Sequence, residues 1–105
     1  MQKTDTIGSI IRYHREESKM PLRKLAYKLD IDQSTLSKIE RDERKINPEL
    51  LDKISDIFNI KIEELQVAYY SDTVAYQISD LESFSKILRV AEKKVEYIRQ
   101  SKSSK

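Results

Sequence analysis

The sequence predicts an all-helical protein, with five helices in one domain and a C-terminal amphipathic helix after them. Apolar residues recur at spacings of three and four along most of the chain, as they do on the buried face of a helix. Leu, Ile, Lys and Glu dominate the composition, which favours helices. The 105 residues include one Gly and two Pro, so little of the turn chemistry that β-hairpins need is present.

The first two helices are predicted from apolar spacing and from their end residues. The first should run from about Thr6 to Ser18, with an apolar face formed by Ile7, Ile10, Ile11 and His14. The second should hold Pro21 in its first turn, where a missing N–H costs nothing. It should end at Asp30, a residue type that tolerates left-handed backbone. Its apolar positions are Leu22, Leu25, Ala26 and Leu29.

Three further helices should complete the domain. Asp32 is a good N-cap for a third helix from Gln33 to about Arg41. Asn47 and Pro48 have the residue types of an N-cap and a first helical position, so a fourth helix should begin there and end at Asn59. A short fifth helix, "IEELQVAYY", should begin at about Ile62.

The C-terminal part should form a separate helical unit. Ser79 and Glu82 match a capping box that would start its helix. Apolar residues then follow the a and d positions of a heptad repeat, at Leu81, Phe84, Leu88, Ala91, Val95 and Ile98. Ile87 and Val90 widen this stripe, so the helix could dimerise or could dock on its own domain, against "LQVAYY". The expected division is a domain at 6–70, a dimerisation extension at 71–100 and a disordered tail at 101–105.

The second and third helices have the pattern of a helix-turn-helix. About three residues join them, and the small Ala26 lets them cross closely. The outer face of the third helix carries short polar side chains, although Ser and Thr are mediocre helix formers. Such side chains permit close approach to B-DNA and can bond base edges in the major groove. The simpler interpretation is a solvated helix face.

The stretch "IGSIIRYHREESKMPLRKLAYKLDIDQSTLSKIERDERKINPELLDKISDIFNIKIEEL" resembles the Cro/phage-repressor (XRE) helix-turn-helix family. The most specific matches are "LA" at Leu25–Ala26, "STLSKIE" at Ser34–Glu40 and the closing "IEEL". The resemblance implies a five-helix phage-repressor-like domain that binds operator DNA as a dimer. It implies base contacts from Gln33, Ser34, Ser37 and Lys38, a phosphate or base-methyl contact from Thr35, and a structural ion pair between Arg15 and Glu40.

The sequence departs from the family pattern at two places. Pro21 and Leu22 stand where Ser or Thr followed by Gln is usual, and Asp30 stands at a turn position usually taken by Gly. A second similarity covers "PLRKLA", "LSKIERDERK" and "LRVAEKKVEYIRQ", which resemble regulators found beside restriction–modification methyltransferase genes.

Phosphate contacts are expected from basic side chains that flank the third helix. The net charge of +2 is too small to indicate a nucleic-acid partner by itself, so the positions of the charges carry the prediction. Lys and Arg at the rims of the groove would contact phosphates. The alternative is ordinary surface charge. The candidates, beside Thr35, are Arg23, Lys24, Arg41, Arg44 and Lys45.

Composition also argues against several classes of protein. There is no Cys and one His, so we expect no enzyme, no metal site and no cofactor. No apolar run approaches the roughly 20 residues of a membrane span, and we expect a cytoplasmic protein without a membrane partner.

The sequence therefore predicts a DNA-binding transcriptional regulator, specific for a double-stranded palindromic operator and acting as a homodimeric repressor or autoregulator. One alternative is the antitoxin or accessory subunit of a toxin–antitoxin or restriction–modification module, bound to a second protein encoded nearby. Another is a helix-turn-helix adaptor that binds only proteins.

Overall fold

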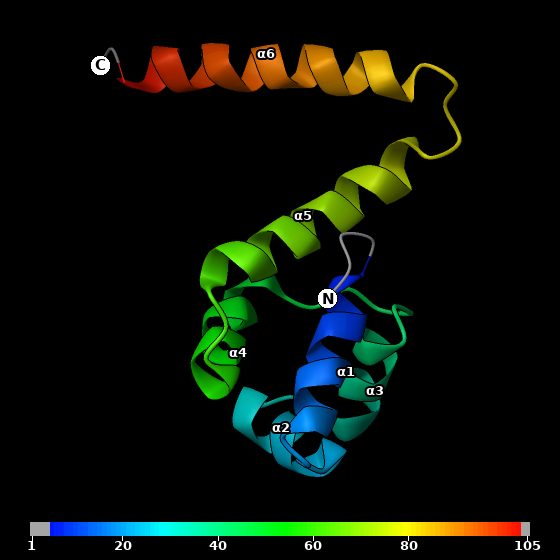
Figure 1. The fold of residues 1–105 in the computed structure, drawn as a ribbon, viewed down its shortest axis with the longest axis vertical. Helices are drawn as coiled ribbons and strands as arrows, with labels where there is room; N and C mark the ends of the chain where they lie inside the picture. The colour runs from blue at the N-terminus through cyan, green and yellow to red at the C-terminus, as the bar shows by residue number, and fades with distance from the viewer. Residues whose placement is uncertain (1–4, 104–105) are drawn as a thin grey trace. The chain divides into compact units, whose positions relative to one another are not determined.

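The computed structural model describes residues 5–103, and they form helices without any strand, as the sequence predicts (Figure 1). The elements in chain order are α1 (Ile7–Glu17), α2 (Leu22–Leu29), α3 (Gln33–Glu40), the 3₁₀ helix η1 (Pro48–Leu50), α4 (Leu51–Phe58), α5 (Ile62–Ile78) and α6 (Phe84–Ser103). No helix among these residues is both long enough and apolar enough to cross a membrane.

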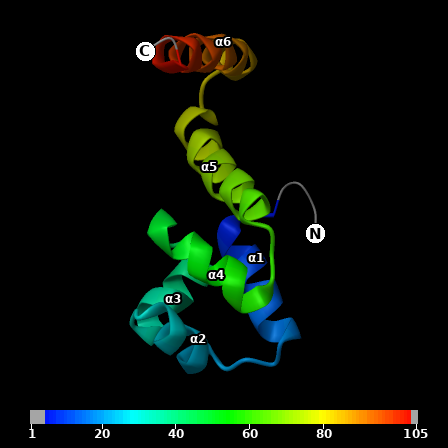
Figure 2. The same ribbon diagram turned by 90° about the vertical axis from the view of Figure 1, so that its left-hand side faces the viewer.

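The chain divides into two compact units, and the division falls inside α5. The first unit reaches Thr73 and the second begins at Val74. In the first unit α3 packs on both α1 and α2, while α4 packs on α1 (Figures 1 and 2). One apolar core joins these helices and the start of α5. Its fully buried large side chains are Ile11, Leu25, Leu29, Leu36, Ile46, Leu51, Ile54 and Leu65.

Several helix ends follow from local chemistry. The Ser9 N–H donates to Thr6 Oγ1 at 3.2 Å, which caps α1, and the Glu49 N–H donates to Asn47 Oδ1 at 3.0 Å, which caps η1. Asp30 ends α2 and Asn59 ends α4, both in left-handed backbone with φ of 56° and 55°. Asp and Asn are the residue types other than Gly that visit this region most readily.

Three boundaries in the first unit and in α5 differ from the prediction. Pro21 is the N-cap of α2 instead of part of its first turn. Pro48 begins a 3₁₀ turn, and the α-helical hydrogen bonds of α4 start only at Leu51. The fifth helix is not short, because α5 continues for 17 residues to Ile78.

The predicted capping box at Ser79 and Glu82 is wrong. Since α5 ends at Ile78, the chain turns immediately afterwards: the Leu81 N–H donates to the Ile78 carbonyl, and the Phe84 N–H donates to the Leu81 carbonyl. The second unit's helix therefore starts at Phe84, and Leu81 precedes it. Residues 101–103, expected to be disordered, continue α6, while 104–105 lie outside the described residues.

Candidate nucleic-acid interface

Helix α3 presents a polar strip on the side opposite its packing face. Leu36 and Ile39 are buried in the core against the neighbouring helices. The strip contains exposed Gln33, Ser34 and Lys38, with half-buried Ser37 beside them. The buried face fixes the helix rotation, so the strip has a defined orientation on the domain.

The Arg15–Glu40 pair fixes α3 against α1. Arg15 Nε donates to Glu40 Oε2 at 2.7 Å and Arg15 Nη2 donates to Oε1 at 2.9 Å, a bidentate pair. Arg15 Nη1 also donates to the Met20 carbonyl at 2.9 Å, which fixes the segment before α2. The exposed fractions are 14% for the Arg15 side chain and 4% for that of Glu40. The hydrogen bond to Glu40 raises the pKa of Arg15, so its charge is permanent.

A second link joins the end of α3 to the start of α1. Thr6 Oγ1 donates to Asp42 Oδ2 at 2.7 Å. A Cβ on Gly8 would lie 2.2 Å from the Ile39 carbonyl oxygen and 2.6 Å from Asp42 Oδ1, so this close approach requires glycine. The Ile7 N–H donates to Asp72 Oδ2 at 2.8 Å, which adds α5 to the same junction.

Sequence analysis missed this junction. The available signal was the chain's only glycine, placed inside a predicted helix. Glycine there costs about 1 kcal/mol relative to alanine, so its presence indicates a steric requirement.

Arg41 is held by two neighbours in the free protein. Its Nη1 donates to Ser37 Oγ, and its Nε donates to a Glu43 carboxylate oxygen. The hydrogen bond raises the pKa of Arg41 and lowers that of Glu43, so both groups are charged at neutral pH. The structure thus brings the predicted phosphate contact Arg41 and the predicted base contact Ser37 together. A phosphate would have to compete with Glu43 for this guanidinium.

Four other predicted phosphate contacts are exposed. Arg23 and Lys24 lie in the first turn of α2, and Arg44 and Lys45 lie in the loop after α3. Neither α2 nor α3 has an acidic residue in its first turn, and no side chain caps either N-terminus. The partial positive charge at the start of α2 is therefore available to anions, whereas the carboxylate of Asp32, the N-cap residue of α3, lies beside the start of that helix. At Pro21, where the family's polar cap is missing, backbone N–H groups remain.

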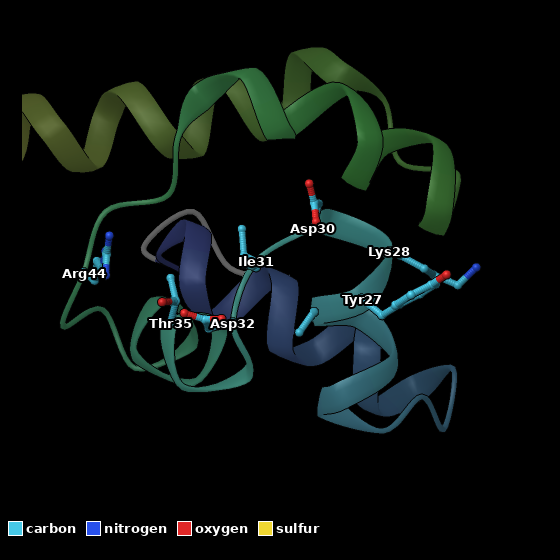
Figure 3. Close-up of a pocket in the computed structure, with 8 residues that line it drawn as sticks. Tyr27, Lys28, Asp30, Ile31, Asp32, Thr35 and Arg44 are labelled. Carbon is cyan, nitrogen blue, oxygen red and sulfur yellow. The ribbon is translucent and has the colours of Figure 1, made fainter.

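Thr35 lies apart from the polar strip. It is half-buried and lines an open hollow of about 720 Å³ beside the turn between α2 and α3. Figure 3 shows Thr35 and Arg44 on one side of this hollow, with Tyr27 and Lys28 on the other. Two carboxylates, those of Asp30 and Asp32, also line it. Thr35 is thus at the edge of the candidate interface. This position is better placed for a contact with the DNA backbone than for one with base edges.

Comparison with known proteins agrees with this geometry. No curated protein and no solved structure matches the chain. A family model described as helix-turn-helix matches residues 11–65, which is 55 of the 105 residues. The matched range contains α2, α3 and the Arg15–Glu40 pair. The chain therefore belongs to the Cro/C1-type (XRE) helix-turn-helix family of DNA-binding domains.

Proposed function

We propose that the protein is a sequence-specific transcriptional regulator, a homodimeric repressor or autoregulator that reads a palindromic operator through the major groove. The observation that carries this proposal is the polar strip of α3. Its Gln33, Ser34 and Lys38 side chains are exposed while the helix behind them is fixed to α1. An α-helix fits the major groove, and Gln, Ser and Lys offer groups that bond base edges.

The function requires fixed side chains, and the contacts of α3 supply this. Specific readout depends on hydrogen bonds whose geometry tolerates little displacement. The Arg15–Glu40 and Thr6–Asp42 contacts tie the C-terminal end of α3 to α1, and the apolar core fixes its inner face. The interface therefore needs little ordering on binding, which favours affinity.

Two copies would read the operator more tightly than one. Helix-turn-helix dimers bind half-sites about one DNA turn apart, roughly 34 Å, and something must hold the copies together. The apolar stripe of α6 supports dimerisation, because no residue of α6 is buried in the single chain. The proposed dimer contacts are Phe84, Leu88, Ala91, Val95 and Ile98 on α6, with Leu81 just before it.

The base contacts can be tested with duplexes selected from a random pool. Gln33→Ala and Lys38→Ala should each weaken binding to the preferred site by about 1–3 kcal/mol and relax the preference at one base position. Lys53→Ala, an exposed cation on α4, is the matched control and should change neither. If both interface variants stay folded and keep full affinity and preference, α3 is not the reading helix.

The phosphate contacts have a different signature. Arg44→Ala should weaken binding to all sequences alike. It should also reduce the slope of log binding constant against log salt concentration by about one. Fluorescence anisotropy over a series of salt concentrations measures this slope. A loss confined to the preferred sequence would instead place Arg44 among the base contacts.

In this proposal the protein acts by binding and not by catalysis, and it works where the DNA is, in the cytoplasm. Mass measurement of the complex purified from the native host tests the partner. A homodimer agrees with the proposal, whereas a complex with a different protein indicates an antitoxin or accessory subunit. A protein that binds another protein but shows no salt-dependent binding to duplex DNA would indicate an adaptor.

A further inference from the structure

The apolar seam of α6 has flanking residues that distinguish one pairing direction from another. The seam side chains Phe84, Leu88, Val95 and Ile98 are each about half exposed in the single chain. Ser85, Glu92 and Arg99 follow one edge of the seam, at e positions. Ile87 and Lys94 follow the other edge, at g positions. Residues at these edges set partner choice and orientation in coiled coils.

A parallel pair of α6 helices would place like charges together. In that arrangement a g residue faces the e residue five positions later on the second copy. Lys94 then faces Arg99, and the two-fold symmetry repeats this contact on the other side. Lysine and arginine are both cationic residue types, so the parallel pair is repulsive at its edges.

An antiparallel pair removes this repulsion. In an antiparallel pair, e positions face e positions of the second copy and g positions face g positions. When the helices cross between Leu88 and Ala91, Glu92 faces Ser85 of the second copy. On the other edge Lys94 faces Ile87, and the four-carbon stem of the lysine can cover the apolar side chain while its ammonium stays in water. Ile87 and Lys94 already border one shallow groove on α6, beside Ala91.

Side-chain size favours the same crossing point. The crossing between Leu88 and Ala91 sets Phe84 against Val95 and Leu88 against Ala91, so each of these two layers joins a larger residue with a smaller one. A parallel pair would set Ala91 on Ala91 and Phe84 on Phe84. The first layer would leave a void and the second would be crowded, and both are unfavourable in a packed interface.

The crossing point also gives Leu81 a partner. Leu81 precedes α6 and is about half exposed. In the antiparallel pair it lies level with Ile98 of the second copy and can cover the end of the seam. One alternative antiparallel crossing, between Glu92 and Lys94, would set Glu92 on Glu92 and Lys94 on Lys94.

From these observations we propose that the second copy's α6 binds antiparallel on α6, with the two helices crossing between Leu88 and Ala91. This inference rests on the proposed function, in which α6 holds the dimer. It adds the direction and the register of the interface.

Disulfide cross-linking of the full chain tests direction and register together, because the protein has no native cysteine. Phe84→Cys and Val95→Cys are oxidised separately and as an equimolar mixture, and intact mass separates the mixed disulfide from the symmetrical ones. A disulfide requires Cα atoms about 4.4–6.8 Å apart. Lys93→Cys, on the outer face of α6, measures cross-linking by random collision.

The proposal expects the mixed disulfide, which joins position 84 of one copy to position 95 of the other, and only the background level of either symmetrical product. In the antiparallel pair two copies of position 84 lie 11 residues apart along the axis, about 16.5 Å at about 1.5 Å per residue, and the spacing between the helices adds to this distance. Ile98→Cys should also remain at background, since two copies of position 98 are about 25 Å apart.

Two results would overturn the inference, and they differ in their consequence for the proposed function. Symmetrical disulfides at 84, 95 and 98 would show a parallel pair and leave the α6 dimer intact. Background cross-linking for every variant, in a protein that sediments as a dimer, would exclude both this crossing and the parallel pair. It would remove the support for this α6 pairing, while base readout by α3 keeps its own test with Gln33→Ala and Lys38→Ala.

Discussion

At the scale of single residues, the Arg15–Glu40 pair offers the clearest energetic prediction. Its side chains are largely removed from water, so removing one partner leaves a buried charge without its counterion. Arg15→Met or Glu40→Met should each lower the free energy of unfolding by about 3 kcal/mol or more. The double variant should lose much less than the sum. Urea titrations of the four proteins measure this coupling.

An exposed pair on the same helix supplies the matched control. Arg12 and Glu16 lie at positions i and i+4 on α1. Arg12 Nε lies 3.2 Å from Glu16 Oε1, and both side chains are 56% exposed. Removing Arg12 should cost less than about 1 kcal/mol. Equal losses at Arg12 and Arg15 would mean that burial contributes nothing to the Arg15–Glu40 pair.

Gly8→Ala should destabilise the domain although alanine is the better helix former. The added methyl group would collide with the Ile39 carbonyl, a backbone atom that cannot rotate away. Overpacking of this kind costs about 1–3 kcal/mol, which exceeds the gain of about 1 kcal/mol in helix propensity. A rise in the urea midpoint would show that α1 and α3 can separate without loss.

At the scale of elements, Asp72 of α5 makes a pH-dependent contact with the start of α1. Burial raises the pKa of Asp72, against the opposing effect of the Ile7 N–H, and Asp42 nearby raises it further. The folded protein thus holds this proton at a pH where the unfolded chain has released it. Stability from this group is therefore greatest in acid and falls as pH rises above about 4.

Asp72→Asn removes the titration and keeps an oxygen that can accept the Ile7 N–H. Relative to this variant, the native protein should lose unfolding free energy between pH 4 and neutral pH. Urea unfolding of both proteins across that range is the measurement. A constant difference between them at all pH values would mean that the Asp72 carboxyl does not titrate abnormally.

The sequence predicts the helices of the first unit because each carries a periodic apolar face and recognisable end residues. It also predicts the strip Gln33, Ser34 and Lys38, because periodicity separates the buried face of α3 from its outer face. The Thr6–Asp42 contact joins residues 36 positions apart, and no local pattern reports it. The capping box failed because Ser79 directly follows the end of α5, where the chain must turn before another helix can start.

At the scale of the whole molecule, a chain ending at Ser79 should lose the dimer and keep the reading domain. Removing α6 removes its seam, while every buried residue of the core lies before Val74. The truncated chain should sediment as a monomer and should bind a full palindrome about 100-fold more weakly or worse, because the second contact is no longer intramolecular. Binding to an isolated half-site should be unchanged. A truncated chain that remains dimeric would place the interface on the first unit.

The length of α6 has a consequence for the dose response. Its 20 residues provide only a few apolar layers, and a seam this short holds two chains together weakly. If the dimer forms as proposed, most of the protein is therefore folded monomer at low concentration. The fraction that dimerises rises with concentration by mass action. Operator occupancy would then rise with the square of the protein concentration. An autoregulator of this kind would leave its own gene almost unrepressed at low protein concentration. It would repress that gene steeply once the protein begins to dimerise.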